Sequence, residues 1–408
     1  MHRRQRGYLA SDQASSVTHC LFTAQAADRP NGGKLFRKRN LVPIAALAAV
    51  ALSLSACAST PPPVAGAVDA KTATSVTAFG GLDGLVKAAE KEGALNVIAL
   101  PADWANYGKI IEAFKKKYPK ITVNSANPDG SSAEEIKAAD DLKGQDTAPD
   151  VFDLGPAVAL ANTAKFAPYK VQTWNDIPAD SKEKTGLWVN DYTGLMSIGY
   201  NSKVITTAPK KLTDLLGSEY KGKVAINGDP TQAGAAFAAV GLAALQSGGS
   251  ADNFQPGIDF FQKLNKAGNF LPVDPTPATI AAGETPVVFD WSYSNLAAAA
   301  ANPGWKVAVL SGTAYGSYYN QAVNIDAPHP AAARLWQEFI YSDQAQNLYL
   351  AAGAFPVRIV AMDKAGKTDK SAQASAGKMP ATFVSPTAAQ ITAAGALLSA
   401  KWAAAISQ

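Results

Sequence analysis

From about residue 80 onward, short apolar runs alternate with segments of helical periodicity. Between Tyr107 and Tyr118, aromatic and isoleucine side chains recur at helical spacing, with lysines on the opposite face. Ser131 and Glu134 are spaced to form a capping box at the start of another helix. The apolar runs have the length of strands and lie at residues 95–100, 121–123, 151–154, 224–226 and 286–289.

This alternation of strands and helices predicts an α/β fold with mainly parallel sheets. About 330 residues follow residue 80, which is enough for two domains. In parallel sheets, ligands bind beyond the carboxyl ends of the strands. The loops that follow the apolar runs are therefore the candidate binding site.

Acids and aromatic residues recur in these loops. The candidate ligand-binding residues are Asp103, Trp104 and Tyr107 after the first strand, Asp229, Thr231 and Gln232 after residues 224–226, Asp290, Trp291 and Tyr293 after residues 286–289, and Tyr318 and Tyr319 between two later strands.

Structural roles explain several of these candidates equally well. Trp104 and Trp291 could be core aromatics, and Asp229 before Pro230 could be a helix N-cap with proline at N1. If Tyr318 and Tyr319 alternate along a strand, one ring faces the cleft and the other the core.

The start of the chain has the features of an export signal. Basic residues at 37–39 precede a 14-residue apolar stretch at 41–54, which is short for a membrane span. The stretch ends Leu54-Ser55-Ala56-Cys57, which resembles the lipobox of bacterial lipoproteins and implies lipidation of Cys57. The alternative is an ordinary signal peptide with an accidental cysteine.

We therefore predict a signal peptide over residues 1–56. Its first 35 residues are interpreted as a spurious N-terminal extension, because acids and mixed polar residues precede the basic segment. Residues 57–77 are rich in Ser, Thr, Pro and Ala, which predicts a lipidated tether.

Charge and rare residues exclude several classes of function. Residues 1–56 hold eight of the 37 basic residues and two of the 33 acidic ones, so 29 basic and 31 acidic residues remain. This leaves no basic surplus for nucleic-acid phosphates. After Cys57 there is no cysteine, and His329 is the single histidine beyond residue 19. A disulfide framework, a zinc thiolate site and a cysteine nucleophile are thereby excluded there.

A secreted hydrolase is the competing class. No Gly-x-Ser-x-Gly elbow or phosphate loop occurs, and His329 lies outside the candidate loops. Counting acids leaves a paired-carboxylate glycosidase open. We predict a protein that is not an enzyme and has no cofactor or bound metal.

Several segments occur in the order found in one family. Residues 81–93, 150–153, 222–224, 283–288 and 332–346 resemble the landmarks of extracellular solute-binding proteins of ABC importers, nearest the spermidine/putrescine and ferric-iron binding branch. The resemblance implies a two-lobed, periplasmic-binding-protein-like fold of type II, with a hinge of two crossing strands near residues 195–200 and 321–325.

The resemblance also implies boundaries and partners. Lobe one would comprise residues 78–195 plus 320–408, and lobe two residues 200–315. A small solute would be captured by a monomer and delivered to an ABC permease and ATPase complex. The protein would be anchored by lipid on the outer side of the cell membrane.

Two ligand classes follow from this branch. Polyamine binders use aromatic walls and acids, but the family's acid near the second hinge strand is Asn320 or Gln321 here, which favours a smaller or less cationic solute. Ferric-iron binders use adjacent tyrosines, and Tyr318 and Tyr319 are such a pair, although at the hinge rather than in the usual lobe-two loop. Ferric iron is the alternative ligand.

Overall fold

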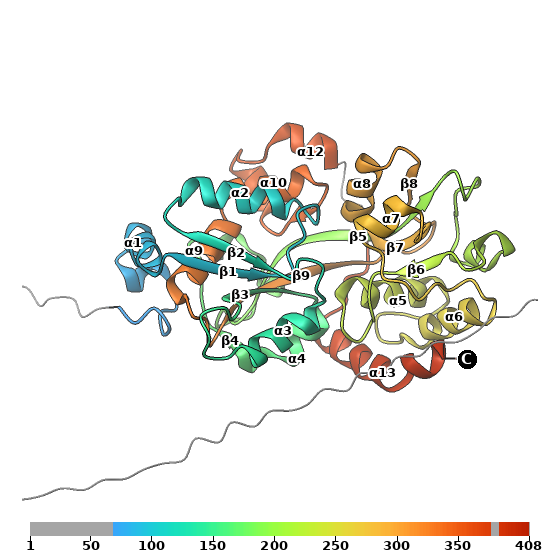
Figure 1. The fold of residues 1–408 in the computed structure, drawn as a ribbon, viewed down its shortest axis with the longest axis horizontal. Helices are drawn as coiled ribbons and strands as arrows, with labels where there is room; N and C mark the ends of the chain where they lie inside the picture. The colour runs from blue at the N-terminus through green and yellow to red at the C-terminus, as the bar shows by residue number, and fades with distance from the viewer. Residues whose placement is uncertain (1–67, 377–382, 408) are drawn as a thin grey trace, which may run out of the picture. The chain divides into compact units, whose positions relative to one another are not determined.

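Two groups of strands, each covered by helices, are joined by two long strands in the computed structural model, which describes residues 68–376 and 383–407 (Figure 1). The predicted signal peptide and Cys57 lie outside the described residues. None of the described helices has the length and apolar character needed to cross a bilayer.

We use "lobe one" for the strands β1 to β4 and their helices. β1 and β2 pair in parallel, and the backbone N–H of Asp150 before β3 donates to Asn96 O in β1 at 2.9 Å. The strands are β1 (Ala94–Ile98), β2 (Thr122–Ala126), β3 (Val151–Leu154) and β4 (Phe166–Ala167). The helices are α1 (Leu82–Glu92), α2 (Tyr107–Lys117), α3 (Ser132–Asp141), α4 (Pro156–Ala161), α9 (Pro330–Ile340) and α10 (Asp343–Ala351).

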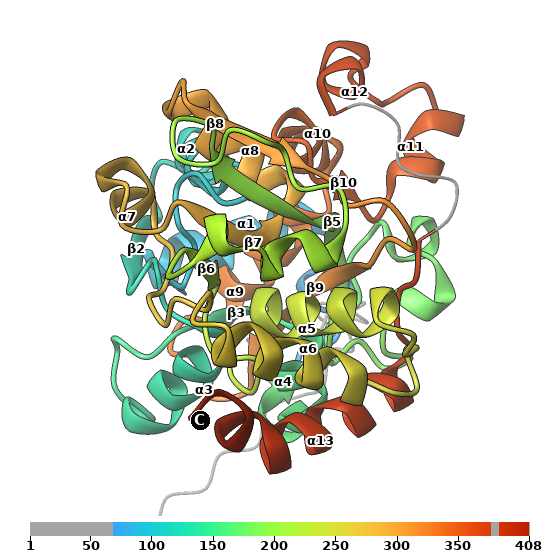
Figure 2. The ribbon, with the colours of Figure 1, turned by 90° about the vertical axis from the view of Figure 1, so that its right-hand side faces the viewer.

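We use "lobe two" for the strands β6 to β8 and their helices. β6 and β7 pair in parallel. The strands are β6 (Val224–Ile226), β7 (Val287–Trp291) and β8 (Trp305–Ala308), and the helices are α5 (Gly234–Gln246), α6 (Gln255–Lys266), α7 (Pro277–Ala282) and α8 (Ser292–Ala301). The alanine-rich α5 is buried along most of its length, and it lies between the strands and α6 (Figure 2).

The lobes are joined by β5 (Val189–Asn201) and β9 (Gly316–Asn324), which run through the middle of Figure 1. β5 pairs with β9 over residues 189–195 and with β7 over residues 196–200. β9 continues into lobe one, where it pairs with β3 and β4. The predicted crossing strands therefore exist, and both are longer than expected.

The expectation of mainly parallel sheets is wrong. Every pairing of β5 and β9 is antiparallel, including those with β3, β4, β7, β8 and β10 (Phe355–Pro356). An alternating pattern identifies a strand but not its direction. The crossing strands run against the strands that βαβ units place in parallel.

Helix starts follow local rules in part. Ser131 caps α3 in the predicted capping box, and His329 is the N-cap of α9, with Pro330 at N1. Asp229 is not the N-cap of α5, which begins at Gly234. Asp229 instead accepts the Thr231 backbone N–H at 2.7 Å and stabilises the turn before that helix.

The chain ends in α13 (Ala388–Ile406), after α11 (Ile359–Lys364) and α12 (Lys370–Ala376). α13 packs on lobe two, where the Trp402 ring lies 5.5 Å from that of Phe261 and Asn265 Nδ2 donates to Ile406 O at 2.8 Å. It also faces α4 of lobe one at Gly395. The predicted lobe boundaries place this helix in lobe one, and those boundaries stay a prediction.

Candidate functional site

A cavity of about 540 Å³ is lined by residues of both lobes. Lobe one contributes residues 99–104 after β1, residues 128–135 around the start of α3, and Asp153 in β3. Lobe two contributes residues 227–235, 274–281 and 290–302, and the crossing strand β9 contributes Tyr319. The cavity therefore lies at the ends of β1, β3, β6 and β7, where the fold class predicts a ligand.

The charge of the lining is one-sided. Among the described residues, the lining includes eight carboxylate side chains and no lysine, arginine or histidine. Five of the carboxylates are exposed at the rim, namely Asp103, Asp129, Glu134, Asp229 and Asp274, and three are buried at the floor, namely Glu135, Asp153 and Asp290.

The lobe-one floor is a network of acids and tyrosines. Asp153 is 5% exposed, and its Oδ2 accepts the hydroxyls of Tyr107 at 2.8 Å and Tyr192 at 3.1 Å. The Tyr107 hydroxyl also lies 3.3 Å from Asp191 Oδ2. Glu135 Oε2 accepts the backbone N–H of Asp153 at 3.0 Å. The residues of this network come from α2, α3, β3 and β5. The nearby ring of Tyr319, which also lines the cavity, comes from β9.

Burial raises the pKa of the acids in this network. Desolvation raises the pKa of Asp153 to about 6, against the hydrogen bonds from the two tyrosines, which lower it. Desolvation and then the charge of Asp153 raise the pKa of Glu135 and of Asp191 well above their ordinary values. Each ionised carboxylate raises the pKa of its neighbours, and no basic side chain of the described residues pairs with these acids to offset the repulsion.

The lobe-two floor holds a single acid. Asp290 is the fourth residue of β7, and its two oxygens accept the Trp291 N–H at 2.7 Å and Asn227 Nδ2 at 3.0 Å. Desolvation raises the pKa of Asp290 to about 7, although the hydrogen bonds from Trp291 and Asn227 lower it.

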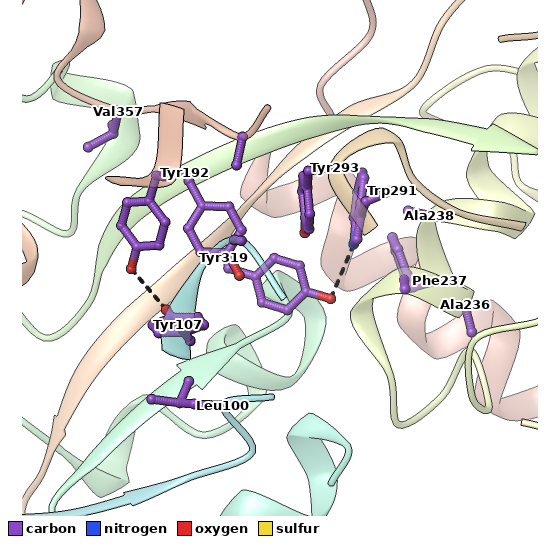
Figure 3. Close-up of a cluster of buried hydrophobic side chains, with 14 of the residues drawn as sticks. Leu100, Tyr107, Tyr192, Ala236, Phe237, Ala238, Trp291, Tyr293, Tyr319 and Val357 are labelled. Atoms are coloured by element: carbon purple, nitrogen blue, oxygen red, sulfur yellow. Dashed lines mark hydrogen bonds between the residues drawn. The ribbon is translucent and has the colours of Figure 1, made fainter. Parts of the chain in front are cut away.

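Aromatic rings from both lobes pack beside the cavity. Trp104 lines it, donates its Nε1 to the Tyr192 hydroxyl at 2.6 Å, and meets the rings of Tyr293 and Tyr319 edge-on at 5.6 and 5.7 Å. Trp291 donates its Nε1 to the Tyr319 hydroxyl at 3.3 Å (Figure 3). The rings thus hold Trp104 and Tyr319 in place at the cavity.

Six of the predicted ligand-binding residues line this cavity. They are Asp103, Trp104, Asp229, Gln232, Asp290 and Tyr319. Tyr107, Thr231, Trp291, Tyr293 and Tyr318 are not among its lining residues. Tyr107 lies behind Asp153, and Tyr318 projects from the opposite face of β9, as alternation along a strand requires.

Two predicted loops are strands. Asp290 and Trp291 end β7, and residues 316–320 belong to β9. The apolar run from Val287 continues through Trp291, which is 1% exposed and packs in the core, as does Tyr293. Whether any of the eleven candidates contacts a solute stays a prediction.

Of the buried acids, the sequence singles out Asp290 as a candidate ligand-binding residue but not Asp153 or Glu135, which fall within a predicted strand and a predicted helix. Asp191 is interpreted from the sequence only as a residue that lines the hinge or packs there, and Asn227 as part of the turn after residues 224–226. The available signal was the position of these side chains, since Asp153 lies in an apolar strand and Glu135 on the buried face of α3. A buried carboxylate needs a partner.

The lobes touch at one edge of the cavity. The Ala133 N–H of α3 donates to Gln232 O at 3.2 Å. Gly155 and Gly234 meet so closely that a Cβ built on Gly155 would lie 2.6 Å from Gly234 Cα. Neither position could carry a side chain without displacing backbone.

Comparison with known proteins agrees with this architecture. Residues 147–379 match the family model for bacterial extracellular solute-binding proteins. No curated relative matches the sequence.

Solved periplasmic binding proteins share the fold. The chain is similar to AfuA from Actinobacillus pleuropneumoniae with exogenous fructose-6-phosphate bound (TM-score 0.63, 16% identity, 77% of this chain and 98% of that one). It is similar to a periplasmic thiamin binding protein (0.59, 17%, 77% and 96%) and to iron-bound HitA from Pseudomonas aeruginosa (0.55, 20%, 75% and 97%).

These likenesses confirm the predicted α/β fold of the type II periplasmic binding proteins. The family match covers more than half of the chain and identifies a non-enzymatic transport component that binds a small solute outside the cytoplasm. The chain belongs to the bacterial extracellular solute-binding proteins, the solute-capturing components of ABC-type transport.

Proposed function

We propose that the protein captures a small organic cation, such as an amine, and delivers it to the permease and ATPase of an ABC importer. The observation that carries this proposal is the lining of the cavity, which in the described part of the chain has eight carboxylates, no basic side chain, and the rings of Trp104 and Tyr319. Carboxylates form charge-assisted hydrogen bonds with ammonium groups, and aromatic faces attract cations.

The arrangement favours an organic cation over ferric iron. Only Tyr319 of the predicted tyrosine pair lines the cavity. Within residues 68–376 and 383–407, no group of three or more His, Cys, Asp or Glu side chains is placed to hold a metal ion. The eight acids are instead distributed along the cavity, which suits an extended cation more than a point charge.

Mass spectrometry of the solute released from natively purified protein tests the proposal. We expect an amine or quaternary ammonium compound. A thermal-shift panel of putrescine, spermidine, choline, thiamin, fructose 6-phosphate and ferric citrate is the companion measurement. A ligand present at 100 times its Kd stabilises the folded state by about 2.7 kcal/mol. Stabilisation by fructose 6-phosphate or ferric citrate alone would contradict the proposal.

We also propose that Cys57 carries the lipid that holds the protein at the membrane. The thiol follows the apolar stretch 41–54 after Ser55 and Ala56, where lipidation requires it. Two acyl chains are sufficient for stable anchoring. We expect Cys57→Ala to move the protein from the membrane to the soluble fraction. Equal membrane retention of both forms would contradict the lipid anchor.

A further inference from the structure

Three acids of the lobe-one floor are buried together without a cation. Glu135, Asp153 and Asp191 are 1%, 5% and 0% exposed. Among the described residues, no lysine, arginine or histidine is paired with any of them. Buried carboxylates without a countercharge are costly, so the site requires either protons or a cationic ligand.

One oxygen of Asp153 has no donor. Its Oδ2 accepts two tyrosine hydroxyls, but within residues 68–376 and 383–407 no donor reaches the buried Oδ1. Asp153 also lines the cavity. This unsatisfied oxygen, in a buried side chain at the cavity wall, is an observation independent of the number of acids. It indicates that a group absent from the protein completes the site.

The groups around Asp153 do not supply a positive charge. Two acids, Glu135 on α3 and Asp191 on β5, interact with it directly, and Asp290 of the opposite wall acts on Tyr319 from across the cavity. The remaining titratable neighbours are six tyrosines, Tyr107, Tyr192, Tyr293, Tyr319, Tyr341 and Tyr349. All of these groups are neutral or negative.

We propose that Asp153 is the primary anchor for the solute's cationic group, and that the cation displaces a proton which Asp153 and Asp191 share in the ligand-free protein. This inference deepens the proposed function and rests on it.

The exchange balances in charge and atoms. In the ligand-free protein, one proton is shared by the carboxyl groups of Asp153 and Asp191, whose Oδ2 atoms both lie within hydrogen-bond distance of the Tyr107 hydroxyl, at 2.8 and 3.3 Å. When an ammonium group binds, it donates a hydrogen bond to the Asp153 carboxylate, and the proton leaves to the solvent. The ammonium keeps all its own protons, because its pKa lies far above neutrality. Solute capture is therefore linked to the release of one proton.

The test is isothermal titration calorimetry of the full-length protein with putrescine and, separately, spermidine. Titrations at pH 6, 7 and 8 in phosphate and in ACES give both Kd and the number of protons released, since these buffers differ in ionisation enthalpy. We expect Kd to weaken by up to about tenfold for each unit of pH decrease, as one released proton requires.

Two variants determine which carboxyl group releases the proton when the amine binds. Asp191→Asn removes the partner that shares it, so we expect binding at pH 8 to persist while proton release and the pH dependence of Kd are lost. Asp290→Asn removes the lobe-two acid, and we expect proton release to persist with weaker binding. Asp83→Asn, an exposed change on α1, is the matched control and should leave both quantities unchanged.

Asp153→Asn should abolish measurable binding of both amines. Its thermal unfolding, compared with that of Asp191→Asn, separates lost binding from lost folding. Should it fail to fold, Glu135→Gln takes its place and should weaken binding at pH 8.

The outcomes separate the two proposals. Amine binding with the same Kd at all three pH values and no proton release would overturn the exchange while leaving the proposed function intact. Proton release that survives in Asp191→Asn and disappears in Asp290→Asn would also overturn it. Absence of binding by either amine at every pH would reject the amine ligand, and the exchange with it.

Discussion

The two walls of the cavity hold buried acids in different surroundings. On the lobe-one wall, Asp153 lies among tyrosine hydroxyls and next to two further carboxyl groups. On the lobe-two wall, Asp290 is bonded by a backbone N–H and an asparagine amide. An acid that shares a network can exchange a proton within it, whereas an isolated acid must exchange with solvent. Under the proposed function, we therefore expect the lobe-one wall to be the better prepared to receive the solute's cationic group.

The tryptophans of the two walls differ in burial, and truncating the buried one is expected to cause the largest change of all the variants considered. Trp291 is 1% exposed in lobe two, so Trp291→Ala should lower the free energy of unfolding by about 3–5 kcal/mol. Trp104 is only half-buried and lines the cavity, so Trp104→Ala should cost less stability and more affinity. Urea denaturation of ligand-free protein measures the first effect. Equal losses of stability in the two variants would contradict the assignment of Trp291 to the core and Trp104 to the cavity lining.

The pH dependence of stability should differ between the walls. The pKa of Asp290 is about 7 in the folded protein, above its ordinary value of 3.8. The unfolded chain loses this proton first, so the stabilisation from protonated Asp290 is complete below about pH 4 and is lost as the pH rises to about 7. The change is on the order of 4 kcal/mol.

Asp290→Asn should therefore flatten the stability profile between pH 4 and 7. Asp153, whose pKa is raised to about 6, should contribute less, so Asp153→Asn should flatten the profile to a smaller extent. Chemical denaturation across this range measures both. A wild-type profile that rises with pH, or a larger change in Asp153→Asn, would contradict the ranking.

The close approach of the two lobes should depend on the contact between Gly155 and Gly234. In Gly155→Ala, the new Cβ would meet Gly234 Cα at 2.6 Å, which prevents the observed approach. We expect the Kd for solute to rise by at least about tenfold, because the closed state becomes less populated. Gly395→Ala on α13 is the control, since its Cβ meets only an ordinary contact at 3.9 Å. Equal affinity of the two variants would show that closure does not require this contact.

The smallest effect is expected at the rim. Asp129 is exposed, so Asp129→Asn should weaken cation binding by only about twofold, because water and salt screen surface charges. The difference from wild type should disappear at high salt. If Asp129→Asn lost as much affinity for the solute as Asp153→Asn, the exposed rim acids would contribute as much to binding as the buried floor acids, contrary to this prediction.

Much of the fold could be predicted from local pattern. Residues 151–154 and 224–226 form strands with the expected bounds, and the capping box at Ser131 exists. Each depends on neighbouring residues alone. The direction of β5 and β9 could not be predicted, because strand direction depends on partners more than 100 residues away in the chain.

The candidate site was only partly predictable for the same reason. Asp103 and Asp290 were found because acids at strand ends are visible in sequence. The floor could not be found, since Asp153 meets Tyr107 and Tyr192 only after α2, β3 and β5 assemble. Conversely, Trp291 was assigned to a loop because a strand ending in Asp-Trp has no distinctive local signal.

The path of the chain into α13 has a mechanical consequence. The Val384 N–H donates to Ala314 O at 2.9 Å, and Val384 O accepts the Gly316 N–H at 3.0 Å, so a third stretch of backbone runs beside the start of β9. The two hydrogen bonds form a single parallel bridge between Tyr315 and Val384, which ties the start of β9 to the segment that leads into α13. This arrangement favours a stiffer joint between the lobes, which would bring the two walls of the cavity together in the same register each time they meet.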